Sequence, residues 1–213
     1  MSVKNSKNIC FIHIATLGNY QHIVDEILSY INPKDFSRII ANIAGEGVVT
    51  LPKEVEVIST RSMLTDFEFS TLNIIKQFCT DNKTLNVLYI HTKGASNTNM
   101  CIDEWRQYML YFNLTNVPNI ERILESTSAC GVDLVNEPVL HFSGNFWWAT
   151  AEHINNLKHP RDIDGIFSER HKCEFWICSN PNSKYTSLHN SNINVYQRHL
   201  TRYPKEKYEK NIN

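Results

Sequence analysis

The stretch Leu85-Asn-Val-Leu-Tyr-Ile-His-Thr-Lys-Gly94 decides the fold of this 213-residue chain. Residues 85–91 are mostly apolar and rich in branched and aromatic side chains, which is typical of a buried strand. A short polar turn follows this strand directly. Such a strand indicates a parallel sheet that helices cover on its faces.

The residues before this strand alternate between strand and helix patterns. Their apolar positions predict strands at 9–15, 38–44 and 55–59 and helices at 20–31 and 69–79. The resulting order β-α-β-β-α-β is typical of a largely parallel sheet with right-handed crossovers. The sequence therefore predicts an α/β fold with a central mixed, mostly parallel sheet flanked by helices.

The second half of the chain has a less regular pattern. It predicts helices at 103–113, 118–126, 151–157 and 169–177, and strands at 131–135 and 139–148. From residue 203 onward the composition is polar and charged, as in a linker or tail. We therefore expect one domain over residues 1–202 and a polar tail at 203–213, which would join it to further C-terminal domains of a longer protein.

Composition excludes several classes of protein. Hydrophobic residues make up 42% of the chain and charged residues 20%, which excludes a disordered chain, a collagen and a coiled coil. The net charge of −1 argues against nucleic-acid binding, because proteins that bind the phosphate backbone carry an excess of positive charge. The six cysteines form no CxxC pair and are expected to be buried, reduced thiols. No membrane span or secretory leader is evident, so we expect a cytoplasmic protein.

Small and polar residues follow three predicted strands, at the end where a parallel sheet binds its ligands. These turns are residues 15–19, 59–62 and 91–94. Arg61 and Lys93 supply positive charge for phosphate groups, and small residues let backbone N–H groups approach a ligand. Either cation by itself is equally well explained as a solvated surface charge. No Gly-x-Gly-x-x-Gly or P-loop motif is present, so a nucleotide site here uses a different pattern.

Adjacent tryptophans, Trp147 and Trp148, lie in the predicted strand 139–148. Because neighbouring strand residues point to opposite faces, we expect one indole in the core and the other in a cleft, where it suits the apolar face of a sugar. Ser143 and Asn145 would bind sugar hydroxyls. Two bulky residues that fill a two-sided core explain the pair equally well.

Glu174 stands among apolar residues of the predicted helix 169–177. A carboxylate in such surroundings has to be paired or functional, which makes Glu174 a candidate catalytic group. An ion pair with Arg170, four residues earlier on the same helix face, is the alternative.

Four segments together resemble GT-A-type nucleotide-sugar glycosyltransferases. They are His91-Thr-Lys-Gly94, Trp105-Arg106, Ser143-Gly-Asn-Phe-Trp-Trp148 and Glu174-Phe-Trp176. The resemblance spans residues 8–200 and extends to enzymes implicated in glycosylating a viral capsid protein. It implies a GT-A-like single domain with a nucleotide-binding half at about 1–95 and an acceptor half at about 96–202. For a viral source it implies the host cytoplasm.

The resemblance implies that a UDP-sugar donates a hexose or deoxyhexose to a glycan acceptor. The nucleotide and donor contacts that it implies are Ala15, Thr16, Asn19, Arg61, Ser62, Asp66, His91, Thr92 and Lys93. The acceptor contacts that it implies are Ser143, Asn145, Trp147 and Trp148. Glu174 would take the acceptor proton in an inverting enzyme, or hold a substrate in a retaining one. Glu68, like Asp66, is a further candidate for a sugar or ribose contact.

A divalent cation, Mn²⁺ or Mg²⁺, is the cofactor that the resemblance implies. The family's Asp-x-Asp motif is expected after the fourth strand, where this chain has His91-Thr92-Lys93. Either His91 is a single ligand assisted by the diphosphate, or Lys93 replaces part of the metal's charge. The literal Asp162-Ile-Asp164 lies in a late loop and is not expected to bind the metal.

Two other functions fit the sequence less well. A noncatalytic sugar- or nucleotide-binding module of a larger enzyme would explain the missing Asp-x-Asp. A glycoside hydrolase needs two carboxylates that flank one bond, and the sequence shows no obvious pair.

Overall fold

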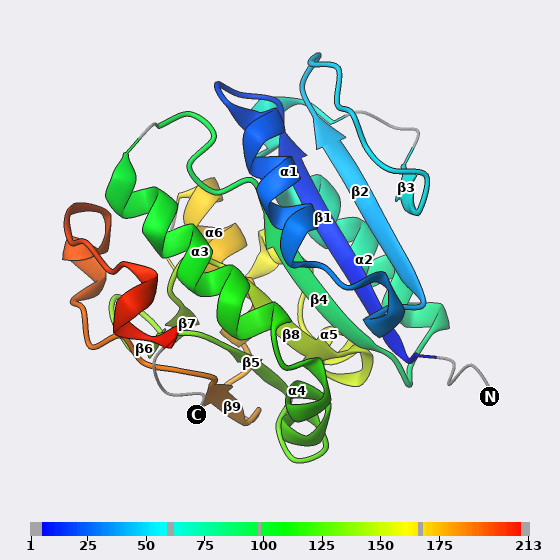
Figure 1. Cartoon of the computed structure of the whole chain (residues 1–213). Coiled ribbons are helices and arrows are strands. Elements are labelled where there is room, and N and C mark those ends of the chain that lie inside the picture. The colour runs from blue at the N-terminus through cyan, green and yellow to red at the C-terminus, as the bar shows by residue number, and fades with distance from the viewer. Residues whose placement is uncertain (1–5, 59–61, 98, 166–167, 210–213) are drawn as a thin grey trace.

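The computed structural model describes residues 6–58, 62–97, 99–165 and 168–209, and its centre is a seven-stranded sheet (Figure 1). In spatial order the strands are β3 (Val55–Val57), β2 (Arg38–Ala44), β1 (Asn8–Ala15), β4 (Asn86–His91), β8 (Trp147–Thr150), β5 (Ala129–Gly131) and β9 (Tyr185–Ser187). The first four are parallel to one another, β8 is antiparallel to both of its neighbours, and β9 is parallel to β5. Two short strands, β6 (Leu134–Val135) and β7 (His141–Phe142), pair separately.

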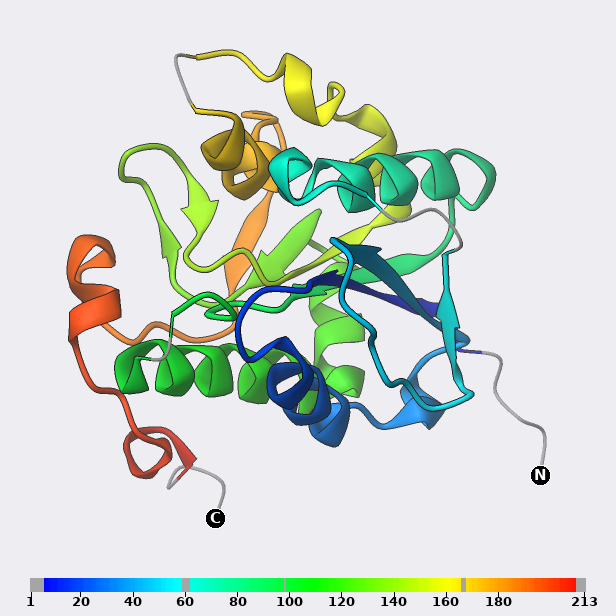
Figure 2. The ribbon, with the colours of Figure 1, turned by 90° about the horizontal axis from the view of Figure 1, so that it is seen from above.

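Helices cover both faces of the sheet, as the view in Figure 2 shows. One face carries α1 (Tyr20–Tyr30), α3 (Met100–Leu114) and α4 (Val117–Leu124), and the other carries α2 (Phe69–Asp81), α5 (Ala151–Asn156) and α6 (Glu169–Phe175). Alternate residues of β1 supply the two cores: Cys10, Ile12 and Ile14 face one, and Ile9 and Phe11 the other. The predicted fold class is confirmed.

The order of the strands places a switch point between β1 and β4. From β1 the chain continues to β2 and β3 on one side, and it then returns to place β4 on the other side of β1. The loops after β1 and β4 therefore leave the sheet in different directions. In open parallel sheets this divergence creates a crevice beyond the carboxyl ends of the strands.

The elements of the first half agree with the sequence patterns, and so do the four predicted helices of the second half, whereas the strands of the second half differ from the prediction. The predicted strand 139–148 is two strands, β7 and β8, because Gly144 and Asn145 adopt left-handed backbone conformations with φ of 95° and 62°. The predicted strand 131–135 is likewise divided between β5 and β6. The edge strand β9 was not predicted.

The C-terminal segment is not an extended linker, at least as far as residue 209. Its Tyr208 is only 3% exposed, and its ring lies 5.4 Å from that of Tyr108 and 5.2 Å from that of Tyr111, both on α3. The carboxylate of Glu104, also on α3, forms an ion pair with Arg202. The polar composition of the segment gave no indication that its aromatic residues pack against α3.

All six cysteines are free, and five of them are buried. Within the described part, no helix has the length and apolar character that a membrane crossing requires.

We expect Tyr208→Ala to lower the free energy of unfolding by about 2–4 kcal/mol, because it removes a buried aromatic ring from the contact with α3. Tyr196→Ala is the matched control, since Tyr196 is 57% exposed, and it should cost less than about 1 kcal/mol. Urea unfolding followed by circular dichroism measures both. Equal effects of the two substitutions would show that the segment does not stabilise the domain.

Candidate functional site

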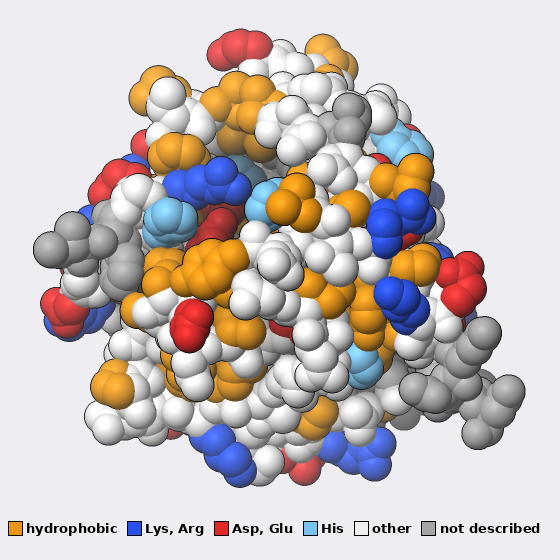
Figure 3. Space-filling model, turned by 90° about the vertical axis from the view of Figure 1, so that its left-hand side faces the viewer, with side chains coloured by type: hydrophobic (Ala, Val, Ile, Leu, Met, Phe, Trp, Pro, Cys, Tyr) orange, Lys and Arg blue, Asp and Glu red, His pale blue; other side chains and the backbone are white. Residues whose placement is uncertain are grey.

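Two adjoining cavities open beyond the carboxyl ends of β1 and β4. The first, of about 290 Å³, is lined by residues that include His13, Ala15, Glu68, His91 and Thr92. The second, of about 550 Å³, is lined by residues that include Trp105, His141, Ser143, Glu174, Tyr196 and His199. Lys93, Gly94, Ser96 and Arg170 line both, so the two cavities form one cleft. The surface in Figure 3 is hollowed where basic, acidic and histidine side chains gather.

Lys93 lies where the two cavities meet. Its Nζ is 4.2 Å from the centre of the Trp105 ring, a cation–π contact, and no described residue forms a hydrogen bond or an ion pair with it. Burial lowers the pKa of Lys93, and the charges of Glu174 and Glu68 oppose that shift. The ammonium thus keeps its three N–H donors for a ligand.

Glu68 and His91 face each other in the first cavity. Glu68 immediately precedes α2, and its Oε1 is 3.5 Å from His91 Nδ1, while His91 Nε2 is 3.0 Å from the carbonyl oxygen of Gly144. Since a carbonyl oxygen only accepts hydrogen bonds, Nε2 carries the proton. Burial lowers the pKa of His91 to about 3, and burial raises the pKa of Glu68.

His13 is a second buried histidine of the first cavity. It lies on β1, and its Nδ1 is 2.7 Å from Thr71 Oγ1, which also accepts a hydrogen bond from Asn42. Burial lowers the pKa of His13 to about 4, so the ring is neutral in the folded protein near pH 7. His13 had no sequence signal beyond being a polar residue within an apolar strand.

Asn145 supports the cleft from behind rather than binding sugar hydroxyls directly. It is 1% exposed, its Nδ2 donates a 2.8 Å hydrogen bond to Glu68 Oε2, and its Oδ1 accepts one of 3.1 Å from the indole of Trp147. The amide therefore fixes the Glu68 carboxylate relative to the core. Its expected role as an acceptor contact is corrected accordingly.

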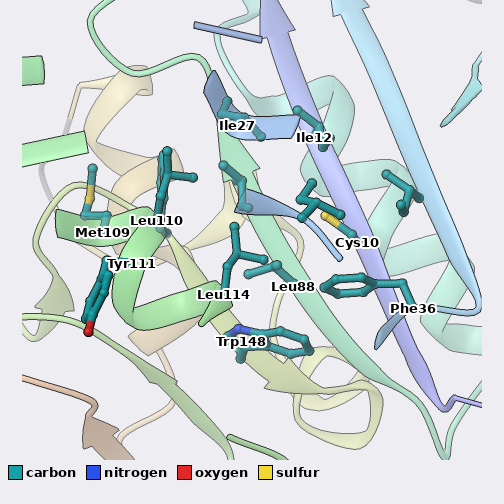
Figure 4. Close-up of a cluster of buried hydrophobic side chains, with 14 of the residues drawn as sticks. Cys10, Ile12, Ile27, Phe36, Leu88, Met109, Leu110, Tyr111, Leu114 and Trp148 are labelled. Atoms are coloured by element: carbon teal, nitrogen blue, oxygen red, sulfur yellow. The ribbon is translucent and has the colours of Figure 1, made fainter. Parts of the chain in front are cut away.

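The expectation that one tryptophan lines a cleft is wrong. Trp147 and Trp148 are both fully buried, and they occupy the two cores on opposite faces of β8. Figure 4 shows Trp148 among side chains from β1, α3 and β4, and its indole donates to the carbonyl oxygen of Asn113. The two-sided core was the correct alternative, because β8 has a helical layer on each face.

Glu174 and Arg170 project from α6 into the cleft. Glu174 lines the second cavity, as a catalytic group would, and its Oε1 is also 3.7 Å from Arg170 Nε, as the alternative stated. Ser143 lines the same cavity, is 2% exposed, and has a hydroxyl without a described hydrogen-bond partner. The sequence treated Arg170 only as a partner for Glu174 and missed its position in both cavities.

The other predicted nucleotide contacts are divided between the cleft and the surrounding structure. Ala15 and Thr92 line the first cavity, where Thr92 Oγ1 accepts a 2.9 Å hydrogen bond from the Ala15 N–H and joins the ends of β1 and β4. Thr16 bonds the backbone of Ala44 and Gly47 instead. Arg61 lies outside the described residues.

Three predicted contacts are not among the residues that line the cleft. Asn19 is exposed at the start of α1, and Ser62 bridges to the end of β2. Asp66 forms an ion pair with Arg161 at 2.9 Å. These positions follow strand ends in the sequence, but only the side chain of Asp66 has a described partner, and that partner lies outside the cleft.

The residues around His91 do not fit the implied Mn²⁺ or Mg²⁺. Because Nε2 of His91 is bonded to Gly144, only Nδ1 could bind a metal ion, and Glu68 is the one carboxylate beside it among the described residues, which makes two ligands at most. Within the described part, no group of three or more His, Cys, Asp or Glu side chains is arranged to hold a metal ion. Asp162 and Asp164 line neither cavity of the cleft, and Asp164 pairs with Lys158.

A family model described as "Domain of unknown function (DUF8361)" matches residues 8–169. The chain belongs to this family. The match includes Glu68, His91 and Lys93 and ends just before Arg170 and Glu174. A comparison with curated protein sequences gives no match.

Among solved structures, the chain is similar to a "Crystal structure of 4-diphosphocytidyl-2C-methyl-D-erythritol synthase". The TM-score is 0.43 and the identity 11%, over 94% of each chain. A likeness of this size says nothing about the activity of this chain. Neither the family model nor the solved structure points to a glycosyltransferase or to viral capsid glycosylation, so these two assignments stay predictions.

We expect His13→Gln to change how stability depends on pH. Because the folded pKa of His13 is about 4 and an unfolded histidine titrates near about 6.5, the unfolded chain binds one more proton between these values. This residue therefore makes the free energy of unfolding fall by about 1.4 kcal/mol per pH unit as the pH drops through that window.

The glutamine variant should lose that part of the slope. Urea unfolding at a series of pH values between about 4 and about 7 measures how the free energy of unfolding depends on pH. His22→Gln, which replaces an exposed histidine of α1, is the control. An unchanged slope in His13→Gln would contradict the assignment of a neutral, buried imidazole.

Proposed function

We propose that the chain is a transferase that binds a nucleoside-diphosphate sugar, and specifically a glycosyltransferase that moves a hexose or deoxyhexose from a UDP-sugar to a glycan acceptor. The observation that carries this proposal is the Lys93 ammonium, which lies where two cavities meet with no described hydrogen-bond partner. A diphosphate is a ligand that uses such a cation, since it is anionic and rich in hydrogen-bond acceptors.

The two cavities suit the two substrates of a transfer. In the proposal the nucleotide and its diphosphate occupy the first cavity, at the switch point of the sheet. The acceptor occupies the second, whose lining combines the hydroxyl of Ser143, the ring of Tyr196 and the Glu174 carboxylate. Hydroxyl, aromatic and carboxylate groups together bind sugars through hydrogen bonds and ring contacts.

In the reaction, the bond between C1 of the sugar and the diphosphate oxygen breaks, and its electron pair leaves with the diphosphate. Lys93 and Arg170 stabilise the negative charge that develops there. The acceptor hydroxyl oxygen forms the new bond to C1 and passes its proton to the Glu174 carboxylate. The viral capsid setting is the biological context that the resemblance implies for this reaction.

A noncatalytic nucleotide- or sugar-binding module is the second candidate. The observation that favours it is the 3.7 Å ion pair between Glu174 Oε1 and Arg170 Nε, which engages the carboxylate proposed as the base. Such a module would bind UDP and leave a UDP-sugar intact, whereas an enzyme would slowly hydrolyse the donor when no acceptor is present.

Hydrolysis of a glycosidic bond is a third candidate function. The sequence showed no obvious pair of carboxylates for it, but the cleft contains two. Glu68 and Glu174 line adjoining cavities, and the negative charges of both carboxylates raise the pKa of Lys93. A hydrolase would cleave glycosides with no nucleotide and would not be stabilised by UDP. The following measurement therefore separates it from the proposed transferase.

We expect UDP to raise the melting temperature more than GDP or CMP does. A ligand at 100 times its Kd stabilises the folded state by about 2.7 kcal/mol, which is about 5–10 °C for a chain of this size. Thermal unfolding with each nucleotide, with and without Mn²⁺, measures the effect. If no nucleotide shifts the transition under either condition, the proposed function is wrong.

We expect Glu174→Gln to reduce sugar transfer by about 10²–10⁴-fold while UDP binding changes little, because the amide cannot take the acceptor proton. Glu169→Gln is the matched control on the same helix, since Glu169 pairs with Arg161 and Lys172 and lines neither cavity. Release of UDP from a UDP-sugar, with a panel of glycan acceptors, measures transfer. Full activity of Glu174→Gln would remove Glu174 from the mechanism.

A further inference from the structure

We propose that the cleft binds the diphosphate without a divalent metal, and that the charges of Lys93 and Arg170 replace the metal. This inference rests on the proposed function, because it concerns how the same site holds its nucleotide. It departs from the Mn²⁺ or Mg²⁺ dependence that the sequence resemblance implies.

The described donor groups do not form a metal site. Mn²⁺ and Mg²⁺ prefer several carboxylate oxygens, and the cleft offers Glu68 and Glu174. Glu68 Oε2 already accepts a hydrogen bond from Asn145, and Glu174 Oε1 lies 3.7 Å from the Arg170 guanidinium. His91 adds one nitrogen at most, Nδ1, because its Nε2 is bonded to the Gly144 carbonyl, so His91 and Glu68 form a pair of ligands and not a set of three.

The cleft that holds the two carboxylates also holds a cation of the chain itself, Lys93. The charges of Glu174 and Glu68 both act on the Lys93 ammonium, which lies in the shared wall of the two cavities. The negative field that would attract a metal ion is therefore balanced by Lys93. A divalent cation placed there would be repelled by this ammonium and by the Arg170 guanidinium.

Lys93 is held in place without using its hydrogen-bond donors. The Trp105 ring supports Nζ at 4.2 Å, and the backbone carbonyl of Lys93 accepts a 2.9 Å hydrogen bond from Arg106. No described residue bonds to Nζ. The side chain is thus oriented by its surroundings while all three N–H groups remain for phosphate oxygens.

Arg170 supplies the second charge from α6. Its side chain is 65% exposed, and its one ion pair among the described residues, to Glu174, is made through Nε. The two terminal nitrogens of the guanidinium remain for the forked contact that arginine makes with phosphate. Lys93 and Arg170 together carry the two positive charges that one Mn²⁺ or Mg²⁺ would bring.

Calorimetric titration of the full chain with uridine, UMP and UDP, in EDTA and in Mn²⁺, tests the inference. We expect the Kd for UDP to differ by less than about 3-fold between the two buffers. Lys93→Met should weaken UDP binding by about 30-fold or more, as for the loss of a buried charge partner, and uridine binding by less than about 3-fold. Lys93→Arg should restore most of the affinity.

Arg170→Met is the second variant, because an exposed side chain on α6 contributes little to folding. It should also weaken UDP binding more than uridine binding. Lys172→Met on the same helix is the matched control, since Lys172 pairs with Glu169 and lines neither cavity. It should leave the Kd for UDP unchanged.

Two outcomes would overturn the inference alone. The first is UDP binding that is more than about 3-fold tighter in Mn²⁺ than in EDTA, and the second is a loss of affinity in Lys93→Met that is the same for uridine as for UDP. Absence of UDP binding to the unmodified chain in both buffers would instead refute the proposed function.

Discussion

A buried guanidinium outside the cleft, that of Arg106, holds the turn that carries Lys93. Arg106 is 1% exposed, and its charge is balanced by Glu26 at 2.5 Å and Asp103 at 2.9 Å. Its remaining nitrogen donates to the carbonyl oxygen of Lys93. Because a buried charge without partners is very costly, these contacts leave the turn little freedom. The position of the Lys93 ammonium therefore depends on the buried contacts of Arg106 with Glu26 and Asp103.

Gly94, the residue after Lys93, also restricts the backbone of this turn. Gly94 has a left-handed backbone with φ of 86°, and a Cβ there would lie 2.7 Å from Ile102 and 3.2 Å from Arg106. A larger residue would therefore have to displace α3 or the buried guanidinium. The glycine lets the chain turn sharply after β4, so that the backbone of Lys93 stays against Arg106 while its side chain reaches the cleft.

The sequence predicted the parts of the fold whose signals are local. The strands around residues 9–15, 38–44 and 85–91 have continuous apolar patterns, and the position of Lys93 follows from the rule that ligands bind beyond strand ends. The sequence could not place Glu68 beside His91, because that contact depends on how α2 returns to the sheet. It expected one of Trp147 and Trp148 in a cleft because alternation along a strand does not reveal that both faces of β8 are covered.

The cleft joins groups from distant parts of the chain, and each part contributes a cation and a carboxylate. The sheet and its turns supply Lys93, Glu68 and His91, whose positions are fixed by buried contacts. The helix α6 supplies Arg170 and Glu174 one turn apart, so that opposite charges project from the same face. Group transfer requires positive charge at the leaving group and a base at the acceptor in a single site. Since Arg170 lines both cavities and Glu174 the second, α6 places the cation nearer the proposed donor and the carboxylate on the acceptor side.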